Sequence, residues 1–230
     1  MLRSHQPNDA RRRHPRPRRG STGPIFSDSF NGSGGVPKNW SEFGSGTVKE
    51  GSGVVALTAS NTSRGQSVGI VSTLASAVIS PLGKSIQAQI KSVSGSPVGN
   101  AIVGILGVPN QNGPTGELAA GIDATGVVFV VVQQQNPAIG QSIMQVGTIK
   151  NYKGGPIALG FSIDATGVTV SAGSTKFAET KFSDFKGFSL KAAFGGGAIP
   201  ALVAAAQPTG NGGSATFGSI TVTTGTLKRR

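Results

Sequence analysis

Short stretches of alternating apolar and polar residues, separated by Gly, Ser, Asn and Pro, run along the chain from Ile25 onwards. The clearest is KSIQAQIKSV at 84–93, in which every second residue from Ile86 to Ile90 is apolar. A period of two places these apolar side chains on one face, so the stretch predicts a half-buried strand. NAIVGILGV at 100–108 is instead a continuous apolar run, which is typical of a strand covered on both sides.

Other segments follow the same rule, because apolar and β-branched residues lie between turn residues. We predict strands in these segments at 24–30, 54–60, 67–73, 156–163, 167–173, 187–194, 201–206 and 215–224. One helical turn fits within 73–83, where Pro81 and Gly83 would end it. Roughly a dozen short strands with short loops predict an all-β fold, a two-sheet antiparallel sandwich in which the first and last strands pair.

The sequence I-D-A-T-G-V occurs twice, at 122–127 and at 163–168. An Asp side chain can accept hydrogen bonds from the backbone of a turn, and Gly tolerates the positive φ needed to leave it. Each copy therefore predicts a strand, a tight turn and a second strand. Two copies are too few for a repeat array, so we interpret them as one hairpin type used twice.

Charge changes this picture only at the two ends of the chain. Seven arginines and Asp9 lie within residues 1–20, a balance of +6, whereas the whole chain carries +12. The last three residues add +3, which leaves the body nearly neutral. Residues 1–23 are rich in Arg, Pro, Gly and Ser and poor in apolar residues, so we expect a disordered arm. The expected organisation is an arm at 1–23, a sandwich at 24–225 and a basic tail at 226–230.

Arginine-rich arms bind phosphate, because guanidinium is always charged and forms two hydrogen bonds with one phosphate group. Such contacts recognise no base sequence and weaken with salt. We therefore predict that nucleic acid binds through its phosphate backbone at Arg3, Arg11, Arg12, Arg13, Arg16, Arg18, Arg19, Lys228, Arg229 and Arg230.

The amino-acid composition narrows the kinds of site and of cellular context that the chain can have. The chain has no Cys, which excludes disulfides and thiolate metal sites, and both His residues lie in the arm. No apolar run approaches the roughly 20 residues of a membrane span, and no apolar segment follows the arginines as an export signal requires. We expect no cofactor, no metal and no membrane contact.

The segment FSDSFNG…VPKNWSEFGSGTVKEGSGVVALTAS resembles the opening of concanavalin A-like (laminin-G-like) jelly-roll domains. SATFGSITVTT is similar to their closing strand, and the two hairpins that contain I-D-A-T-G-V look like their mid-sheet hairpins. The resemblance covers about residues 24–225 and implies a jelly-roll sandwich. Glucanases of this superfamily carry a Glu-x-Asp-x-x-Glu strand that supplies nucleophile and acid, and this triplet does not occur here. The arm, RRRHPRPRRG, is similar to those of small icosahedral RNA virus coat proteins such as the cucumovirus group.

Catalysis is not expected from the residues. The eight carboxylates outside the arm nowhere stand at i, i+2 or i, i+4, and two-carboxylate glycoside hydrolysis needs a facing pair. They are Asp28, Glu42, Glu50, Glu117, Asp123, Asp164, Glu179 and Asp184. A nucleophilic Ser would also lack a His base in the body. We interpret the Phe residues mostly as core.

Two aromatic residues are candidates for contact with a sugar. Tyr152 lies between Lys150 and Lys153 in a predicted loop, where its ring would be exposed. Trp40 precedes a Gly-rich hairpin, and such a Trp more often plugs the edge of a core than binds a ligand.

The sequence therefore supports two functions. The first is a non-enzymatic, self-associating structural protein of the viral coat type, found in a virion, whose arm neutralises packaged nucleic acid. The alternative is a lectin-like module of the concanavalin A-like superfamily that binds a glycan or another surface. The first predicts a homo-oligomer with nucleic acid, whereas the second predicts a glycan partner.

Overall fold

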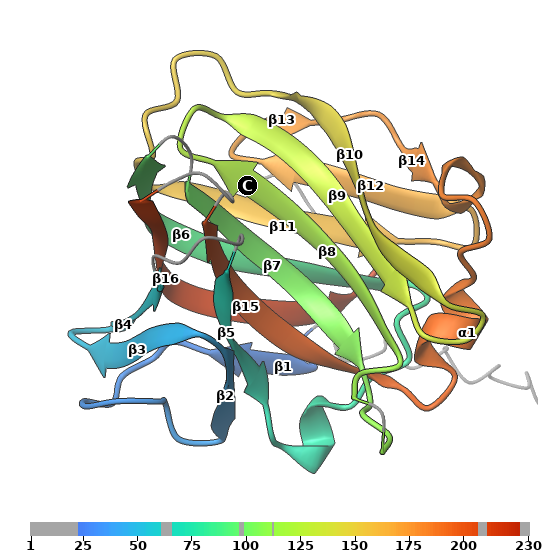
Figure 1. Cartoon of the computed structure of the whole chain (residues 1–230), viewed down its shortest axis with the longest axis horizontal. Coiled ribbons are helices and arrows are strands. Elements are labelled where there is room, and N and C mark those ends of the chain that lie inside the picture. The colour runs from blue at the N-terminus through green and yellow to red at the C-terminus, as the bar shows by residue number, and fades with distance from the viewer. Residues whose placement is uncertain (1–22, 61–65, 97–98, 112, 207–210, 226–230) are drawn as a thin grey trace, which may run out of the picture.

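The computed structural model describes residues 23–60, 66–96, 99–111, 113–206 and 211–225 of the chain. These residues form two antiparallel sheets that lie face to face, as Figure 1 shows. Short strands and tight turns dominate because β-branched residues, Ser, Thr and Gly are abundant while strong helix formers are sparse. The predicted all-β jelly-roll sandwich is confirmed.

The front sheet in Figure 1 has seven strands in the order β10-β9-β8-β7-β15-β5-β2. The bounds of its strands are β2 (Trp40–Gly44), β5 (Ser67–Ser72), β7 (Gly99–Gly107), β8 (Gly116–Asp123), β9 (Val127–Gln134), β10 (Ile139–Thr148) and β15 (Ala198–Ala206). The sequence did not predict β10. Two register shifts against β9 interrupt its period of two, so its alternation is hard to detect.

The back sheet has nine strands, seven of them in the order β13-β12-β11-β6-β16-β4-β3. Its strands are β1 (Phe26–Asp28), β3 (Gly46–Gly51), β4 (Val54–Ala59), β6 (Lys84–Ser96), β11 (Ile157–Ile163), β12 (Gly167–Ala172), β13 (Thr175–Lys176), β14 (Thr180–Lys181) and β16 (Asn211–Thr224). β1 pairs with β16, with Phe26 opposite Val222, so the first and last strands pair as predicted.

The core lies between the two sheets. Alternate residues of each central strand point into it, and those at 0% exposure include Val103, Leu118 and Val130 from the front sheet and Ile86 and Phe217 from the back sheet. Burying one such side chain contributes about 1.5–3 kcal/mol. The alternation predicted for 84–93 is therefore present, because the apolar residues of β6 face this core.

Three short helical segments lie among the strands: η1 (Ala75–Ala77), η2 (Phe182–Asp184) and α1 (Leu190–Phe194). The turn expected within 73–83 is η1. The strand predicted at 187–194 is wrong, since this segment contains α1. Ser189 caps that helix by accepting a hydrogen bond from the Ala192 backbone, and Leu, Lys and Ala favour helix. None of the helices in the described ranges has the length and apolarity that a membrane-crossing helix needs.

Both I-D-A-T-G-V copies form turns through their Asp side chain. Asp123 Oδ1 accepts hydrogen bonds from the Thr125 and Val127 backbones between β8 and β9. Asp164 Oδ1 accepts from the Thr166 backbone and side chain between β11 and β12, and these bonds lower the pKa of its carboxyl. Gly126 has the expected positive φ of 96°. The Gly of the second copy instead begins β12.

Candidate functional site

The outer face of the seven-stranded sheet carries a second group of packed apolar side chains, separate from the core. It consists of Ile102, Ala119, Phe129, Val131 and Val203, with Phe43 and Ala205 at its border. These residues alternate along their strands with core residues, so they point away from the back sheet. Figure 1 is viewed onto this face, and no described element crosses in front of β7, β8 and β9. The apolar run at 100–108 is therefore continuous because alternate residues belong to the core and the others face this outer group.

Strand register aligns part of this face into one row that runs across six strands. Each residue of the row stands directly opposite the next, in the order Phe129, Gly121, Ile102, Val203, Gly69 and Phe43. We call this the Phe–Gly row. A phenylalanine lies at each end, and a glycine stands beside each phenylalanine.

The two glycines of the Phe–Gly row make room for the two rings. A Cβ atom added to Gly121 would lie 2.2 Å from Phe129 Cζ, and one added to Gly69 would lie 2.3 Å from Phe43 Cζ. Each ring therefore extends over its neighbouring strand instead of standing upright. The result is a low, uncharged floor with a phenylalanine at each end, and its packed side chains keep little exposure, 8% for Phe129 and Ile102 and 7% for Val203.

Polar groups border this floor on the β8–β10 side. Gln145 stands opposite Phe129, and Gln133 stands opposite Glu117. Burial raises the pKa of the Glu117 carboxyl, although a hydrogen bond with Gln141 partly opposes the shift. Ile143 on β10 is 61% exposed and forms an apolar rim. Amides and a carboxyl group with a raised pKa are thus the hydrogen-bonding groups beside the floor.

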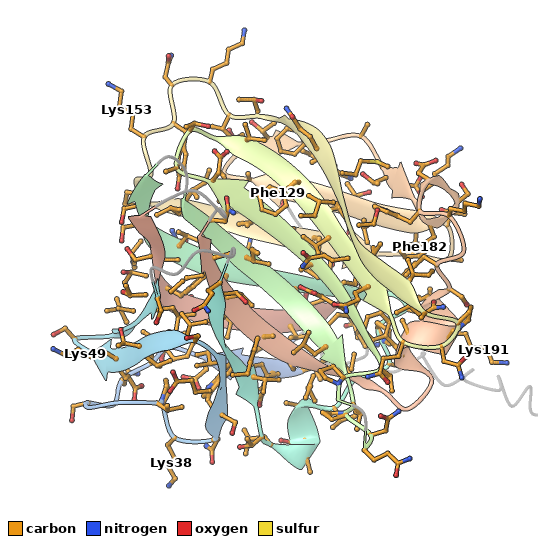
Figure 2. The ribbon with its side chains drawn as sticks, in the orientation of Figure 1. Lys38, Lys49, Phe129, Lys153, Phe182 and Lys191 are labelled. Carbon is orange, nitrogen blue, oxygen red and sulfur yellow. The ribbon has the colours of Figure 1, made fainter. Side chains whose placement is uncertain are left out.

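Positive charge lies away from this face. Figure 2 places Phe129 over the middle of the sheet, whereas Lys38, Lys49, Lys153 and Lys191 extend from the periphery of the molecule. The outward positions of the described parts of β7, β8 and β9 include two ionisable groups, Glu117 and Asp123, and Asp123 Oδ1 accepts hydrogen bonds from the backbone of its own turn. A neutral ligand therefore fits this surface better than a polyanion.

Trp40 lies at the edge of the core. Its side chain is 7% exposed, and its ring centroid lies 6.0 Å from that of Phe26 and 5.7 Å from that of Phe30. The indole Nε1–H donates a 2.8 Å hydrogen bond to Asp28 Oδ2. Trp40 therefore packs at the edge of the core, as the sequence suggested, and its ring has no open face for a sugar.

Tyr152 follows β10 and is half-buried. Its hydroxyl group donates a 2.8 Å hydrogen bond to the Gly155 carbonyl, and its ring packs against the core. Burial, helped by the negative charge of Asp123, raises the pKa of the phenol to about 12. Its predicted contact with a ligand stays a prediction. The structure places neither Tyr152 nor Trp40 in the Phe–Gly row.

The basic residues predicted to bind nucleic acid, from Arg3 to Arg19 and from Lys228 to Arg230, lie outside the described residues. Among the described residues no three His, Cys, Asp or Glu side chains come close enough to hold a metal ion. Asp28 accepts hydrogen bonds from the Phe30 backbone and from Trp40.

Sequence reasoning missed the outer-face residues. Phe43 and Phe129 were interpreted as core, and Glu117 was one of several scattered carboxylates. A usable signal was the start of β8, where Glu117, Ala119 and Gly121 occupy successive outward positions. The glucanase triplet is Glu-x-Asp-x-x-Glu. At the matching positions β8 has Glu117, but Ala119 replaces the Asp and Ile122 replaces the second Glu.

No family model matches the sequence, and no curated protein matches it. Solved structures do match. A structure from work on endo-acting O-glycanases of human gut microbiota has a TM-score of 0.63 at 15% identity, covering 90% of this chain and 100% of that one. An endo-1,3-beta-glucanase from Streptomyces sioyaensis gives 0.61 at 14%, with 94% and 100% covered. A GH16 protein from Bacteroides ovatus, in complex with the product G4G4G3G, gives 0.61 at 14%, with 86% and 99% covered.

These neighbours correct two predictions. The coat-protein function, with its virion, RNA-binding and capsid character, is contradicted because the matching structures are carbohydrate-active proteins. The prediction that the chain is not an enzyme is contradicted by the same neighbours, which include glucanases. The resemblance of the arm to viral coat proteins finds no support. The described sandwich has the concanavalin A-like jelly-roll fold found in family 16 glycoside hydrolases.

Proposed function

We propose that this chain is a carbohydrate-active jelly roll that binds a neutral glycan along the Phe–Gly row of the seven-stranded sheet. The observation that carries the proposal is the continuous uncharged row from Phe43 to Phe129, on a fold shared with proteins that act on glycans. This proposal corresponds to the lectin-like alternative from the sequence.

The chemistry of the face suits a sugar chain. Sugar rings have apolar C–H faces that pack on aromatic and aliphatic carbon, while their hydroxyl groups need donors and acceptors at the border. Phe43 and Phe129 supply the carbon, and the amides of Gln133, Gln141 and Gln145 can both donate and accept. Five strand spacings of about 4.8 Å separate the two phenylalanines, so the row spans about 24 Å. That length accommodates several sugar units.

Glycan hydrolysis at this face is the second candidate function. Glu117 favours it, because a carboxyl group with a raised pKa can act as a general acid. Two-carboxylate hydrolysis needs a partner about 5–9.5 Å away. The next outward positions on β8, Ala119 and Gly121, carry none, and Asp123 at the end of the strand lies about 20 Å from Glu117, which is too far. The second group must therefore come from another segment or from the substrate, as it does in substrate-assisted hydrolysis.

Gel retardation tests the binding. The full chain is run through native gels that contain laminarin, mixed-linkage glucan or mucin glycans. Ile143→Glu places a charge on the rim of the face, and Leu82→Glu is its matched control, since Leu82 is also exposed, at 50%, but lies in the turn before β6. We expect retardation by at least one glycan, lost in Ile143→Glu and kept in Leu82→Glu. Absence of retardation in all three gels, or equal behaviour of the two variants, would refute the proposal.

Release of reducing ends from the same glycans tests hydrolysis. If the wild type releases them, Glu117→Gln should abolish the release while retardation remains. If the wild type releases none, hydrolysis is excluded for these substrates, and the binding result stands by itself.

A further inference from the structure

A hollow lies at the edge of the sandwich, away from the Phe–Gly row. It has a volume of about 570 Å³ and opens to solvent between the β1–β16 pair and the segment that follows β5. In Figure 1, β1 runs behind β2 and β5. Its lining includes Ile25, Ser27, Asn39, Leu74, Ser219 and Thr221.

One wall of the hollow is a group of hydroxyl side chains set by strand register. Ser27 on β1 stands directly opposite Thr221 on β16, so their Cβ atoms lie about 4.5–5.5 Å apart. Ser219 is two residues before Thr221 and points to the same side, because Ile220 between them faces the core at 0% exposure. Within the described ranges, none of these three hydroxyl groups forms a hydrogen bond inside the protein. All three can donate to and accept from a ligand.

The other walls add an amide and two aliphatic side chains. Ile25, which is 39% exposed, and the half-buried Leu74 supply apolar contact beside the hydroxyl groups. Asn39 contributes an exposed side-chain amide. Asp28 is the ionisable lining residue, and its two oxygens are engaged by the Phe30 backbone and Trp40. The free groups of the hollow are therefore neutral.

Strained backbone flanks the hollow on both sides. Asn39 has φ 67° and Phe30 has φ 50°, and a positive φ is unusual for a residue as bulky as Phe. Such a conformation stores strain in a residue as bulky as Phe, and strained residues concentrate at binding sites. Asp28 holds the Phe30 conformation by accepting the Phe30 N–H at 2.9 Å. The surrounding contacts thus maintain the shape of the hollow before any ligand binds.

We infer that this hollow is a second glycan-binding site, which takes one neutral sugar unit through the hydroxyl groups of Ser27, Ser219 and Thr221. Hydroxyl groups that both donate and accept complement the hydroxyl groups of a sugar, and Ile25 with Leu74 covers its C–H face. The inference does not depend on binding at the Phe–Gly row, because the two sites share no residue.

Amide chemical shifts of the full ¹⁵N-labelled chain test this inference, with glucose, galactose, mannose and glucuronate as probes. We expect one neutral sugar to shift the amides of 25–29, 39, 74 and 219–221 in a saturable way. Thr221→Val keeps the shape of the residue and removes its hydroxyl group, so it should weaken binding about threefold to tenfold. Ser219→Ala is a second variant with the same expectation. Thr223→Val, on the same side of β16 but outside the hollow, is the matched control and should bind like the wild type.

Three results would overturn the inference: no saturable shift with any neutral sugar, binding of glucuronate alone, or equal affinities for Thr221→Val and Thr223→Val. The same spectra record the amides of β7, β8 and β9 separately. Failure of the hollow and failure of the Phe–Gly row are therefore distinguishable within one titration.

Discussion

Replacing Gly121 by Ala tests whether the Phe129 ring lies over β8 as described. The added Cβ would meet the ring at 2.2 Å, so the ring must leave the floor or the strands must move apart. Overpacking of this kind costs about 1–3 kcal/mol. Gly121 lies in a regular strand, where Ala itself lowers the entropy of the unfolded chain and contributes about 0.4–1 kcal/mol of stability. The net expectation is a loss of about 1–2 kcal/mol.

The Phe129→Ala background separates the clash from other effects. Without the ring, Gly121→Ala should become stabilising by about 0.4–1 kcal/mol, so the two backgrounds should differ by about 1–3 kcal/mol. Urea unfolding of the four proteins measures this coupling. In thermal unfolding, each kcal/mol corresponds to about 2–4 °C for a chain of this size.

An equal effect of Gly121→Ala in both backgrounds would refute the arrangement of the floor. The pair Gly69 and Phe43 repeats the geometry at the other end of the Phe–Gly row and should give the same sign of coupling. If one end couples and the other does not, the row is not continuous.

Three further predictions follow from single groups. Trp40→Phe removes the hydrogen bond to Asp28 and should cost about 1.5–3 kcal/mol in urea unfolding, with a much smaller cost in an Asp28→Ala background, which has no acceptor; equal costs would contradict the bond. Tyr152 is the one tyrosine of the chain, so ultraviolet titration of the folded protein should show a single phenolate transition near pH 12, and a midpoint near 10 would contradict its burial. The pKa of Glu117 is higher in the folded state than its ordinary value of 4.5. Between the unfolded and the folded pKa, the folded state keeps a proton that the unfolded chain has lost. The free energy of unfolding therefore falls as pH rises through this range. Glu117→Gln should therefore be more stable than the wild type at pH 7 and comparable at pH 4, measured by unfolding at both values; a less stable variant at pH 7 would contradict the shift.

Local sequence signals predicted most of the fold. The alternation in 84–93 gave β6, and the Asp residues of the two I-D-A-T-G-V copies gave the turns after β8 and β11. These signals work because strand periodicity and turn hydrogen bonds involve residues only a few positions apart. The segment 187–194 was mistaken for a strand, since a helix of five residues is too short to show a helical period.

The candidate site depended on contacts that no local pattern contains. Phe43 and Phe129 are 86 positions apart in the sequence, and their place at the two ends of one row follows from five successive strand registers. A shift of one residue in any of these registers would turn a strand's outward residues to the other face. The sequence by itself determined an all-β sandwich with a neutral body and cationic ends. Only the tertiary structure decided which phenylalanines leave the core and which hydroxyl groups meet in the hollow, because long-range pairing sets those positions.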